Sequence, residues 1–92
     1  MKQMAVFFGT GQHVIPVIGA LDRELDLSLV VTTEDEEKRG PVFNYCRENN
    51  LEVYSIYQFS KDVINTLYEE RAKVAVLASF GLIIPDEVLN MF

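Results

Sequence analysis

With 92 residues, the chain is long enough for one small hydrophobic core but shorter than the usual domain of about 100–150 residues, so we expect one domain or a piece of one. Hydrophobic residues at 49% and charged residues at 24% are typical of globular proteins and exclude a disordered or fibrous chain. The formal net charge of −6 argues against a nucleic-acid-binding surface, because it repels a phosphate backbone.

The chain has one cysteine, Cys46, and one histidine, His13. Cys46 cannot form an internal disulfide, and neither residue has neighbours at the spacing of zinc ligands, so we expect no metal site and a reducing compartment. No apolar run approaches the ~18 residues of a membrane span, and no signal-peptide cleavage pattern occurs. These features predict a cytoplasmic protein with no membrane partner.

The first half of the chain alternates strand and helix patterns. An apolar run at residues 4–8, bounded by Gly9, is typical of a strand covered on both faces. The glycine-containing loop at residues 9–13 leads to aliphatic residues at helical spacing, and this helix is expected to end near Arg23. Residues 27–31 predict a second strand, rich in β-branched side chains.

The acidic run at residues 34–37 is expected to be a solvated loop, because nothing in the sequence orients its carboxylates toward one point. A second helix is predicted to start at Gly40-Pro41 and to be terminated by Asn49-Asn50. Residues 53–56 are short and alternating, which favours a third, edge-like strand.

Ser60 is the predicted N-cap of a third helix. Four side chains form the predicted apolar face of that helix: Val63, Ile64, Leu67 and Tyr68. Residues 73–78 are the most apolar strand pattern in the chain, so they are predicted to form a central strand. Pro85 and Asp86 open a last short helix, with the acid at the positive end of the helix dipole.

This βαβαβαβα order predicts an α/β fold. We expect a Rossmann-like open parallel sheet of four strands in the order 3-2-1-4, with right-handed crossovers and helices on both faces. In such sheets, ligands bind at the carboxyl ends of the strands where the winding reverses. The predicted crevice therefore lies between residues 9–13 and residues 79–84.

One interpretation of this crevice is a dinucleotide site. Gly9 and Gly11 give part of the fingerprint for such a site, and Glu34 or Asp35 lies near the place of its acidic residue. The fingerprint also needs a small residue where the helix packs closely on the strand, and Val14 stands there. The match is partial, so this interpretation is the less favoured one.

Two side chains near the crevice carry reactive groups. The imidazole of His13 could pair with a phosphate or a carboxylate, but a plain loop or cap histidine is the more common case. Ser79 follows the fourth strand without an accompanying base or orienting acid. We predict no catalytic role for either residue.

Three stretches of the chain resemble the folate-dependent formyltransferases, and most closely the methionyl-tRNA formyltransferase family. They are VFFGTGQHVIPVIGAL at residues 6–21, RGPVFNYCRENNLEVY at residues 39–54 and VLASFGLIIPDEVLNMF at residues 76–92. The third is the most specific, because it is similar to a strand-loop-helix segment of the family in which an aromatic residue, a glycine and aliphatic residues precede a proline. The resemblance covers nearly the whole chain in the same order.

The resemblance implies transfer of a formyl group from 10-formyltetrahydrofolate to an amine, with no metal. It implies a wall and backbone contacts of the pteridine pocket from five residues: Phe80, Gly81, Leu82, Ile83 and Ile84. It places a substrate-side loop at four more: Gly9, Thr10, Gly11 and His13. The alternative for the aliphatic residues is that they simply cap the core, and such residues commonly do both.

In the methionyl-tRNA family the amine belongs to initiator methionyl-tRNA, which implies a role in translation initiation and protein biosynthesis. A nucleotide-sugar N-formyltransferase, which shares the fold and the donor, is the alternative within the enzyme class. The rival from another class is a stand-alone Rossmann-like nucleotide-binding or interaction module.

The family's catalytic Asn, His and Asp belong to segments that have no counterpart in these 92 residues. The resemblance therefore implies that residues 1–92 are the amino-terminal part of one formyltransferase domain, a truncated fold with no catalytic residue and no activity alone. In that case the fourth strand has an unpaired edge, and we expect self-association through that edge.

Overall fold

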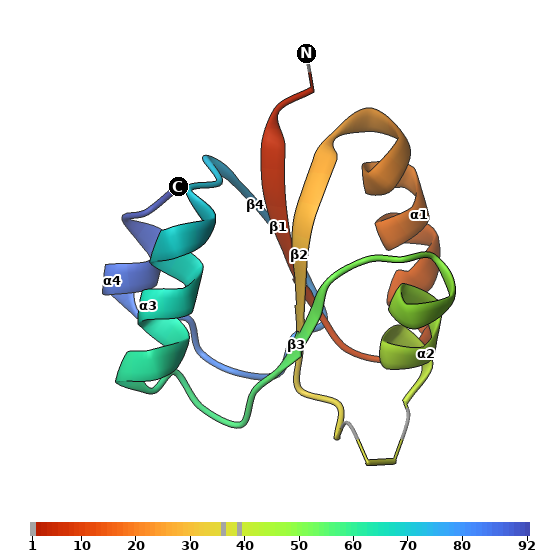
Figure 1. Ribbon diagram of the computed structural model, residues 1–92. Coiled ribbons are helices and arrows are strands. Elements are labelled where there is room, and N and C mark those ends of the chain that lie inside the picture. Colours follow the sequence, from red (N-terminus) through yellow and green to blue (C-terminus); the bar gives the residue numbers. More distant parts are fainter. Residues whose placement is uncertain (1, 36, 39) are drawn as a thin grey trace.

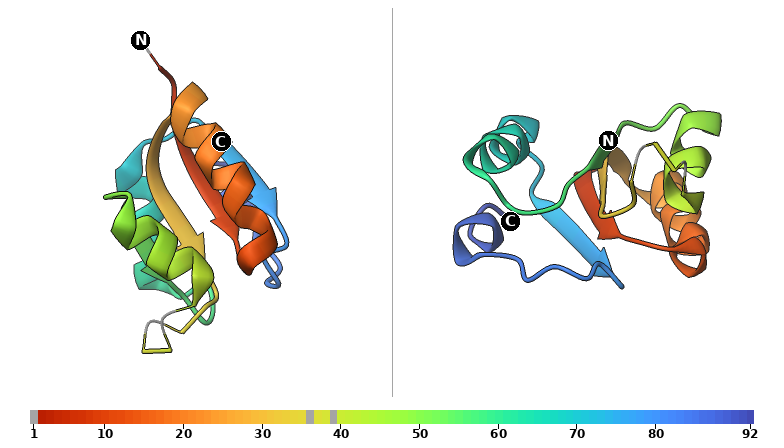
Figure 2. Two further views of the ribbon diagram at one scale, coloured as in Figure 1. Left: turned by 90° about the vertical axis from the view of Figure 1, so that its right-hand side faces the viewer. Right: turned by 90° about the horizontal axis from the view of Figure 1, so that it is seen from below.

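The computed structural model describes residues 2–35, 37–38 and 40–92 (Figure 1). Its elements in chain order are β1 (Met4–Gly9), the 3-10 turn η1 (Gln12–Val14), α1 (Ile15–Glu24), β2 (Asp26–Thr32), α2 (Pro41–Glu48), β3 (Val53–Ser55), α3 (Lys61–Glu70), β4 (Val74–Ala78) and α4 (Asp86–Leu89). The four strands are all parallel in the order β3-β2-β1-β4. Helices α1 and α2 cover one face of the sheet and α3 and α4 the other (Figure 1, Figure 2). The predicted α/β fold is confirmed.

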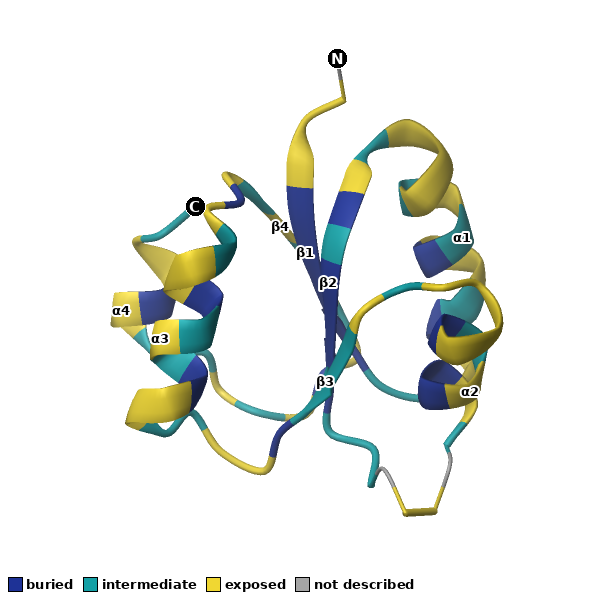
Figure 3. Cartoon of the chain, in the orientation of Figure 1, coloured by how far each residue is buried: buried dark blue, intermediate teal, exposed yellow. Residues whose placement is uncertain are grey.

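Alternation along β1 divides the hydrophobic core into two layers. Val6 and Phe8 belong to the layer that packs on α3 and α4, whereas Phe7 belongs to the layer that packs on α1 and α2. Figure 3 shows these layers as buried segments along β1 and β2 and on the inner sides of the helices. Burial on both faces explains why the first strand is apolar at every position, since each apolar side chain gains by leaving water.

The fourth strand lies at an edge of the sheet, where the sequence predicts a central strand. Within the described residues, β4 pairs with β1 alone. Val76 and Ala78 pack partly against the layer under α1 and α2, but Leu77, on the opposite face beside Phe8, is 58% exposed. A continuous apolar run predicts cover on both faces, and here α3 and α4 leave part of β4 uncovered.

Helix α3 begins at the predicted N-cap, but one side chain of its predicted apolar face is exposed. The hydroxyl of Ser60 accepts a hydrogen bond from the Val63 amide at 3.3 Å, which confirms the N-cap. Val63 and Leu67, one turn apart, are buried, and Ile64 is partly buried. Tyr68 is 72% exposed, so its predicted place on the apolar face is wrong, because it lies at the margin of this stripe beside α4. No helix in the described part of the chain is long and apolar enough to cross a membrane.

Glu34 caps α2, although the sequence predicts a solvated loop at this position. Its Oε1 accepts hydrogen bonds from the amides of Val42 at 3.0 Å and Phe43 at 3.2 Å, in the first turn of the helix. The helix needs such an acceptor, because Gly40 at its start has no side chain to offer. A side chain at Gly40 would overlap the Glu34 carboxylate in its present position, so the glycine leaves room for this cap. Glu36 of the acidic run lies outside the described residues.

Replacing Glu34 by alanine should therefore lower the free energy of unfolding by about 2 kcal/mol, because the amides at the start of α2 lose a charged acceptor. Glu37→Ala is the matched control, since Glu37 is an exposed acid of the same run. This control should change stability by less than about 0.5 kcal/mol. Urea unfolding at neutral pH measures both values, and equal losses in the two variants would contradict the cap.

Cys46 is fully buried in the layer between the sheet and α1 and α2. Burial, reinforced by the negative charges of Glu34 and Asp22, raises the pKa of the Cys46 thiol to about 12. The thiol therefore stays neutral in the folded chain at physiological pH, and it packs as a small hydrophobic group.

This pKa predicts a loss of stability in alkali. The thiol has a pKa of 9.0 in the unfolded chain and about 12 in the folded chain, so only the unfolded state gains from ionisation between these values. The contribution is fully present below pH 9 and is lost as the pH rises toward 12. Between about pH 8 and pH 10.5, the native chain should lose about 2 kcal/mol more than Cys46→Ala in urea unfolding. Parallel losses in both proteins would refute this.

Candidate functional site

The carboxyl ends of β1 and β4 bring together two loops that are far apart in the sequence. Gly9 is paired with Ala78 at the end of the sheet, and the Thr10 amide donates a hydrogen bond to the Ser79 carbonyl at 3.2 Å. The loops that begin at these residues therefore lie side by side. They occupy the edge at which open parallel sheets bind ligands.

The side chain of Thr10 links both loops to the end of β2. Its Oγ1 lies 2.7 Å from Thr33 Oγ1, accepts a hydrogen bond from the Thr33 amide at 3.1 Å and lies 3.3 Å from the Phe80 carbonyl oxygen. The fully buried Thr32 has its Oγ1 3.4 Å away, where it also accepts from the Glu34 amide at 3.3 Å. The sequence pattern does not predict this network, because Thr32 and Thr33, at the end of β2 and just after it, carry no signal beyond the end of a strand.

The carboxylate of Glu34 is hydrogen-bonded to a backbone amide of the glycine-containing loop. Its Oε2 accepts a hydrogen bond from the Gly11 amide at 3.0 Å, while its Oε1 holds the start of α2. A dinucleotide site would place a phosphate against such a loop, where this carboxylate would repel it. Val14, 1% exposed, fills the core where the fingerprint needs a small residue. The geometry therefore argues against a dinucleotide at this loop.

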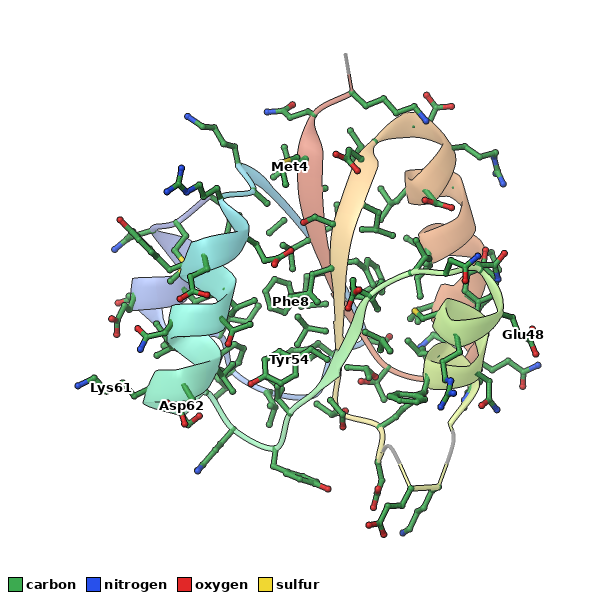
Figure 4. The ribbon with its side chains drawn as sticks, in the orientation of Figure 1. Met4, Phe8, Glu48, Tyr54, Lys61 and Asp62 are labelled. Atoms are coloured by element: carbon green, nitrogen blue, oxygen red, sulfur yellow. The ribbon has the colours of Figure 1, made fainter. Side chains whose placement is uncertain are left out.

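The side chain of Phe80 belongs to the hydrophobic core. It is 3% exposed, and its ring centroid lies 5.4 Å from that of Phe8, edge to face, and 6.0 Å from that of Phe59. Phe8 itself projects from β1 toward α3 (Figure 4). What Phe80 presents at this edge of the sheet is its backbone, since its carbonyl oxygen meets the threonines and its ring is buried in the core.

Residues 81–84 expose backbone polar groups next to this edge. Gly81 has a φ of 93°, which favours glycine, and no atom lies within 4 Å of the place where a side chain would begin. Ile83 is 93% exposed, whereas Leu82 and Ile84 pack partly against the core. Within the part of the chain that the structure describes, the amides and carbonyls of these four residues make no hydrogen bond. They are available to a ligand.

The remaining side chains at this edge of the sheet do not assemble an acid–base pair. His13 is exposed on η1, and its ring lies beside Gly11. Ser79 is exposed and has a φ of 50° at the start of the turn that leaves β4. Among residues 2–35, 37–38 and 40–92, no group of three or more His, Cys, Asp or Glu side chains could hold a metal ion. The chemistry that this edge offers is hydrogen bonding from the backbone.

The chain is similar in sequence to formyltransferases. No protein-family model matches it. A methionyl-tRNA formyltransferase of Acetivibrio thermocellus is 35% identical over 94% of the chain, and one of Carboxydothermus hydrogenoformans is 29% identical over the same share. A third, from Coxiella burnetii, is 29% identical over the whole chain. The chain spans about 30% of the length of these relatives.

The fold is similar to that of a solved formyltransferase structure. The phosphoribosylglycinamide formyltransferase of Coxiella burnetii matches 97% of this chain and 46% of its own length, with a TM-score of 0.65 and 16% sequence identity. At this identity the likeness concerns the fold alone. The resemblance predicted from the sequence is thus confirmed: the chain is similar in sequence to methionyl-tRNA formyltransferases along nearly its whole length, and its fold is similar to that of a formyltransferase.

Proposed function

We propose that residues 1–92 form the amino-terminal part of a folate-dependent formyltransferase domain, most similar to that of the methionyl-tRNA enzymes. In the complete protein, a formyl group would pass from 10-formyltetrahydrofolate to the amino group of initiator methionyl-tRNA, in the cytoplasm, at the start of translation. The three relatives named above, at 29–35% identity over nearly the whole chain, support this proposal. The role of this chain within that reaction is to hold the formyl donor.

The observation that carries the proposal is the row of free backbone groups at residues 81–84. A pteridine is a flat ring system with hydrogen-bond donors and acceptors around its edge, so its site needs apolar walls and a few well-placed backbone groups. Leu82 and Ile84 offer partly buried aliphatic surface, and Ile83 is exposed beside them. These residues fit one side of such a ring, while Phe80 contributes its backbone only.

The loop at residues 9–13 would face the acceptor. Thr10 is turned toward Thr33 and Phe80, and the Gly11 amide is bonded to Glu34, so neither is free to bind an acceptor. His13 is exposed and remains available. Its imidazole could meet an anionic group of the acceptor, which is a binding role and not a proton transfer.

Formyl transfer to an amine also requires groups that stabilise a tetrahedral oxyanion and take a proton from the attacking nitrogen. We assign neither task to a residue of this chain. The isolated 92 residues should therefore bind the donor weakly and transfer nothing.

Binding of a reduced folate tests this directly. With 5-formyltetrahydrofolate as a stable probe, the ¹⁵N amide signals of residues 81–84 should shift in a saturable manner, because these free amides would meet the edge of the ring. A dinucleotide such as NADH is the control ligand, and it should leave residues 9–13 unchanged because Glu34 occupies the Gly11 amide.

Saturable shifts at residues 9–13 with the dinucleotide, and none with the folate, would overturn the proposal in favour of a nucleotide-binding module. The same preparation, given 10-formyltetrahydrofolate and charged initiator tRNA, should show no formyl transfer above background. Turnover by the chain alone would contradict the absence of a catalytic group.

We also propose that the isolated chain associates with a second copy of itself through β4. The strand has one free edge in the described residues and no charged side chain between Val74 and Ala78. Natural edge strands usually carry Lys, Pro or a bulge that prevents pairing. With Leu77 58% exposed on one face, two such edges can pair and bury apolar surface together.

Leu77→Lys tests this association, because a lysine on the edge strand opposes pairing. The native chain should show a concentration-dependent rise in mass by sedimentation equilibrium, and Leu77→Lys should stay monomeric over the same range. Tyr57→Lys is the control, since Tyr57 is 76% exposed just after β3, at the opposite edge of the sheet, and this variant should associate as the native chain does. A native chain that remains monomeric at high concentration would exclude the association.

A further inference from the structure

We propose that Thr10 and Thr33 are positioning residues that fix the orientation of the peptide between Phe80 and Gly81, so that the Gly81 amide is presented to the ligand of residues 81–84. The inference rests on the proposed function, because it assumes that a ligand binds there. It adds the residues that decide which way the first free amide of that stretch points.

Two hydroxyl groups converge on one carbonyl oxygen. The Phe80 carbonyl oxygen lies 3.3 Å from Thr10 Oγ1 and 3.4 Å from Thr33 Oγ1, and the two hydroxyls lie 2.7 Å apart. The Thr33 amide donates to Thr10 Oγ1 at 3.1 Å, which fixes one of the acceptor positions of that oxygen. The three residues come from the ends of β1, β2 and β4.

The donor count of the hydroxyls leads to the same result in either arrangement. Each hydroxyl can donate one hydrogen bond and accept two. If Thr33 donates to Thr10, then Thr10 has its proton free for the Phe80 carbonyl. If Thr10 donates to Thr33, then Thr33 has its proton free for the same carbonyl. In both arrangements one O–H is left that can reach the Phe80 carbonyl, so each threonine can partly replace the other. Thr32 Oγ1, 3.4 Å from Thr10 Oγ1, is the competing acceptor for the Thr10 proton.

This bond decides the direction of the next amide. Every peptide bond in the described chain is trans, so the N–H of Gly81 points opposite to the C=O of Phe80. Because the carbonyl points at the threonines, the Gly81 amide points away from the strand ends. Gly81 is exposed, and its amide has no hydrogen-bond partner among the described residues, so it can meet a ligand.

The buried ring of Phe80 cannot fix this direction alone. The ring is held by Phe8 and Phe59, which locates the residue. Rotation of the peptide between Phe80 and Gly81 by about half a turn would leave the ring in place while exchanging the directions of C=O and N–H. That flip would carry Gly81 from positive to negative φ, and glycine populates both signs of φ about equally. The threonine hydroxyls are what oppose the flip.

The test compares the affinity of the chain for 5-formyltetrahydrofolate across four variants by NMR titration. The double variant Thr10→Val, Thr33→Val removes both hydroxyls and should weaken binding about tenfold, with a changed amide shift at Gly81 before ligand is added. Each single valine variant should cost much less than the double one, because the other hydroxyl still reaches Phe80. The double serine variant keeps both hydroxyls and should bind within about twofold of the native chain.

Thr66→Val is the matched control. Its hydroxyl also donates to a backbone carbonyl, that of Asp62 at 2.9 Å, but within α3 and away from the crevice. This variant should bind folate as the native chain does, whatever it does to stability. If the loss of folate affinity is proportional to the loss of folding stability in both Thr66→Val and the double valine variant, the inference is overturned.

Gly81→Ala gives a second test that leaves both threonines in place. Alanine avoids positive φ, so it favours the flipped peptide, and the open space at this position lets the variant fold. It should weaken folate binding and shift the signals of residues 81 and 82, and it decides the matter if the double valine variant does not fold. Native affinity in either variant overturns the positioning role while leaving the proposed function intact. A native chain that binds no folate overturns the proposed function, and this inference with it.

Discussion

The hydroxyl of Thr10 holds together the carboxyl-terminal edge of the sheet. In the order β3-β2-β1-β4, only the residue after β1 has β2 on one side and β4 on the other. Thr10 uses that place: its backbone amide bonds the loop after β4, and its side chain bonds the end of β2. Loops at such an edge must satisfy their polar groups without a neighbouring strand, and a short hydroxyl side chain can both donate and accept.

The way these bonds are shared decides what the edge can bind. The Glu34 carboxylate accepts hydrogen bonds from the Gly11 amide and from the first turn of α2, so the loop after β1 would repel an anion. The threonines take the Phe80 carbonyl, and the Phe80 ring fills the core. Among the described residues, the amides and carbonyls of residues 81–84 have no hydrogen-bond partner. An uncharged heteroaromatic edge suits such groups, whereas a phosphate does not suit a loop that already holds a carboxylate.

Much of this fold follows from local sequence patterns. Strand and helix alternation predicts the parallel order, and Ser60 predicts the start of α3, because both depend on neighbours along the chain. The predictions that the structure contradicts depend on contacts between residues that are distant in the sequence. Glu34 caps a helix whose N-cap residue, Gly40, has no side chain, and the cover over β4 depends on where α3 and α4 come to lie. Tyr68 is exposed because the sheet meets only a narrow stripe of α3.

The position of the candidate site could be predicted from the sequence, but its side-chain contacts could not. The ends of β1 and β4 mark the crevice from topology, and resemblance to the family points to residues 80–84. Topology and resemblance do not predict that the Phe80 ring is buried, because its position depends on contacts with Phe8 and Phe59. They also do not predict that Thr32 and Thr33 contact Thr10. Such contacts appear only when the strands are side by side.

Hydrogen exchange of two glycine amides tests the central claim most directly, that the loop after β1 is closed and the loop after β4 is open. The Gly11 amide bonds to Glu34, and the Gly81 amide has no partner in the described residues. In the native chain without ligand, the account predicts slow exchange at Gly11 and exchange close to the unprotected rate at Gly81. Fast exchange at Gly11 together with protection at Gly81 would contradict it.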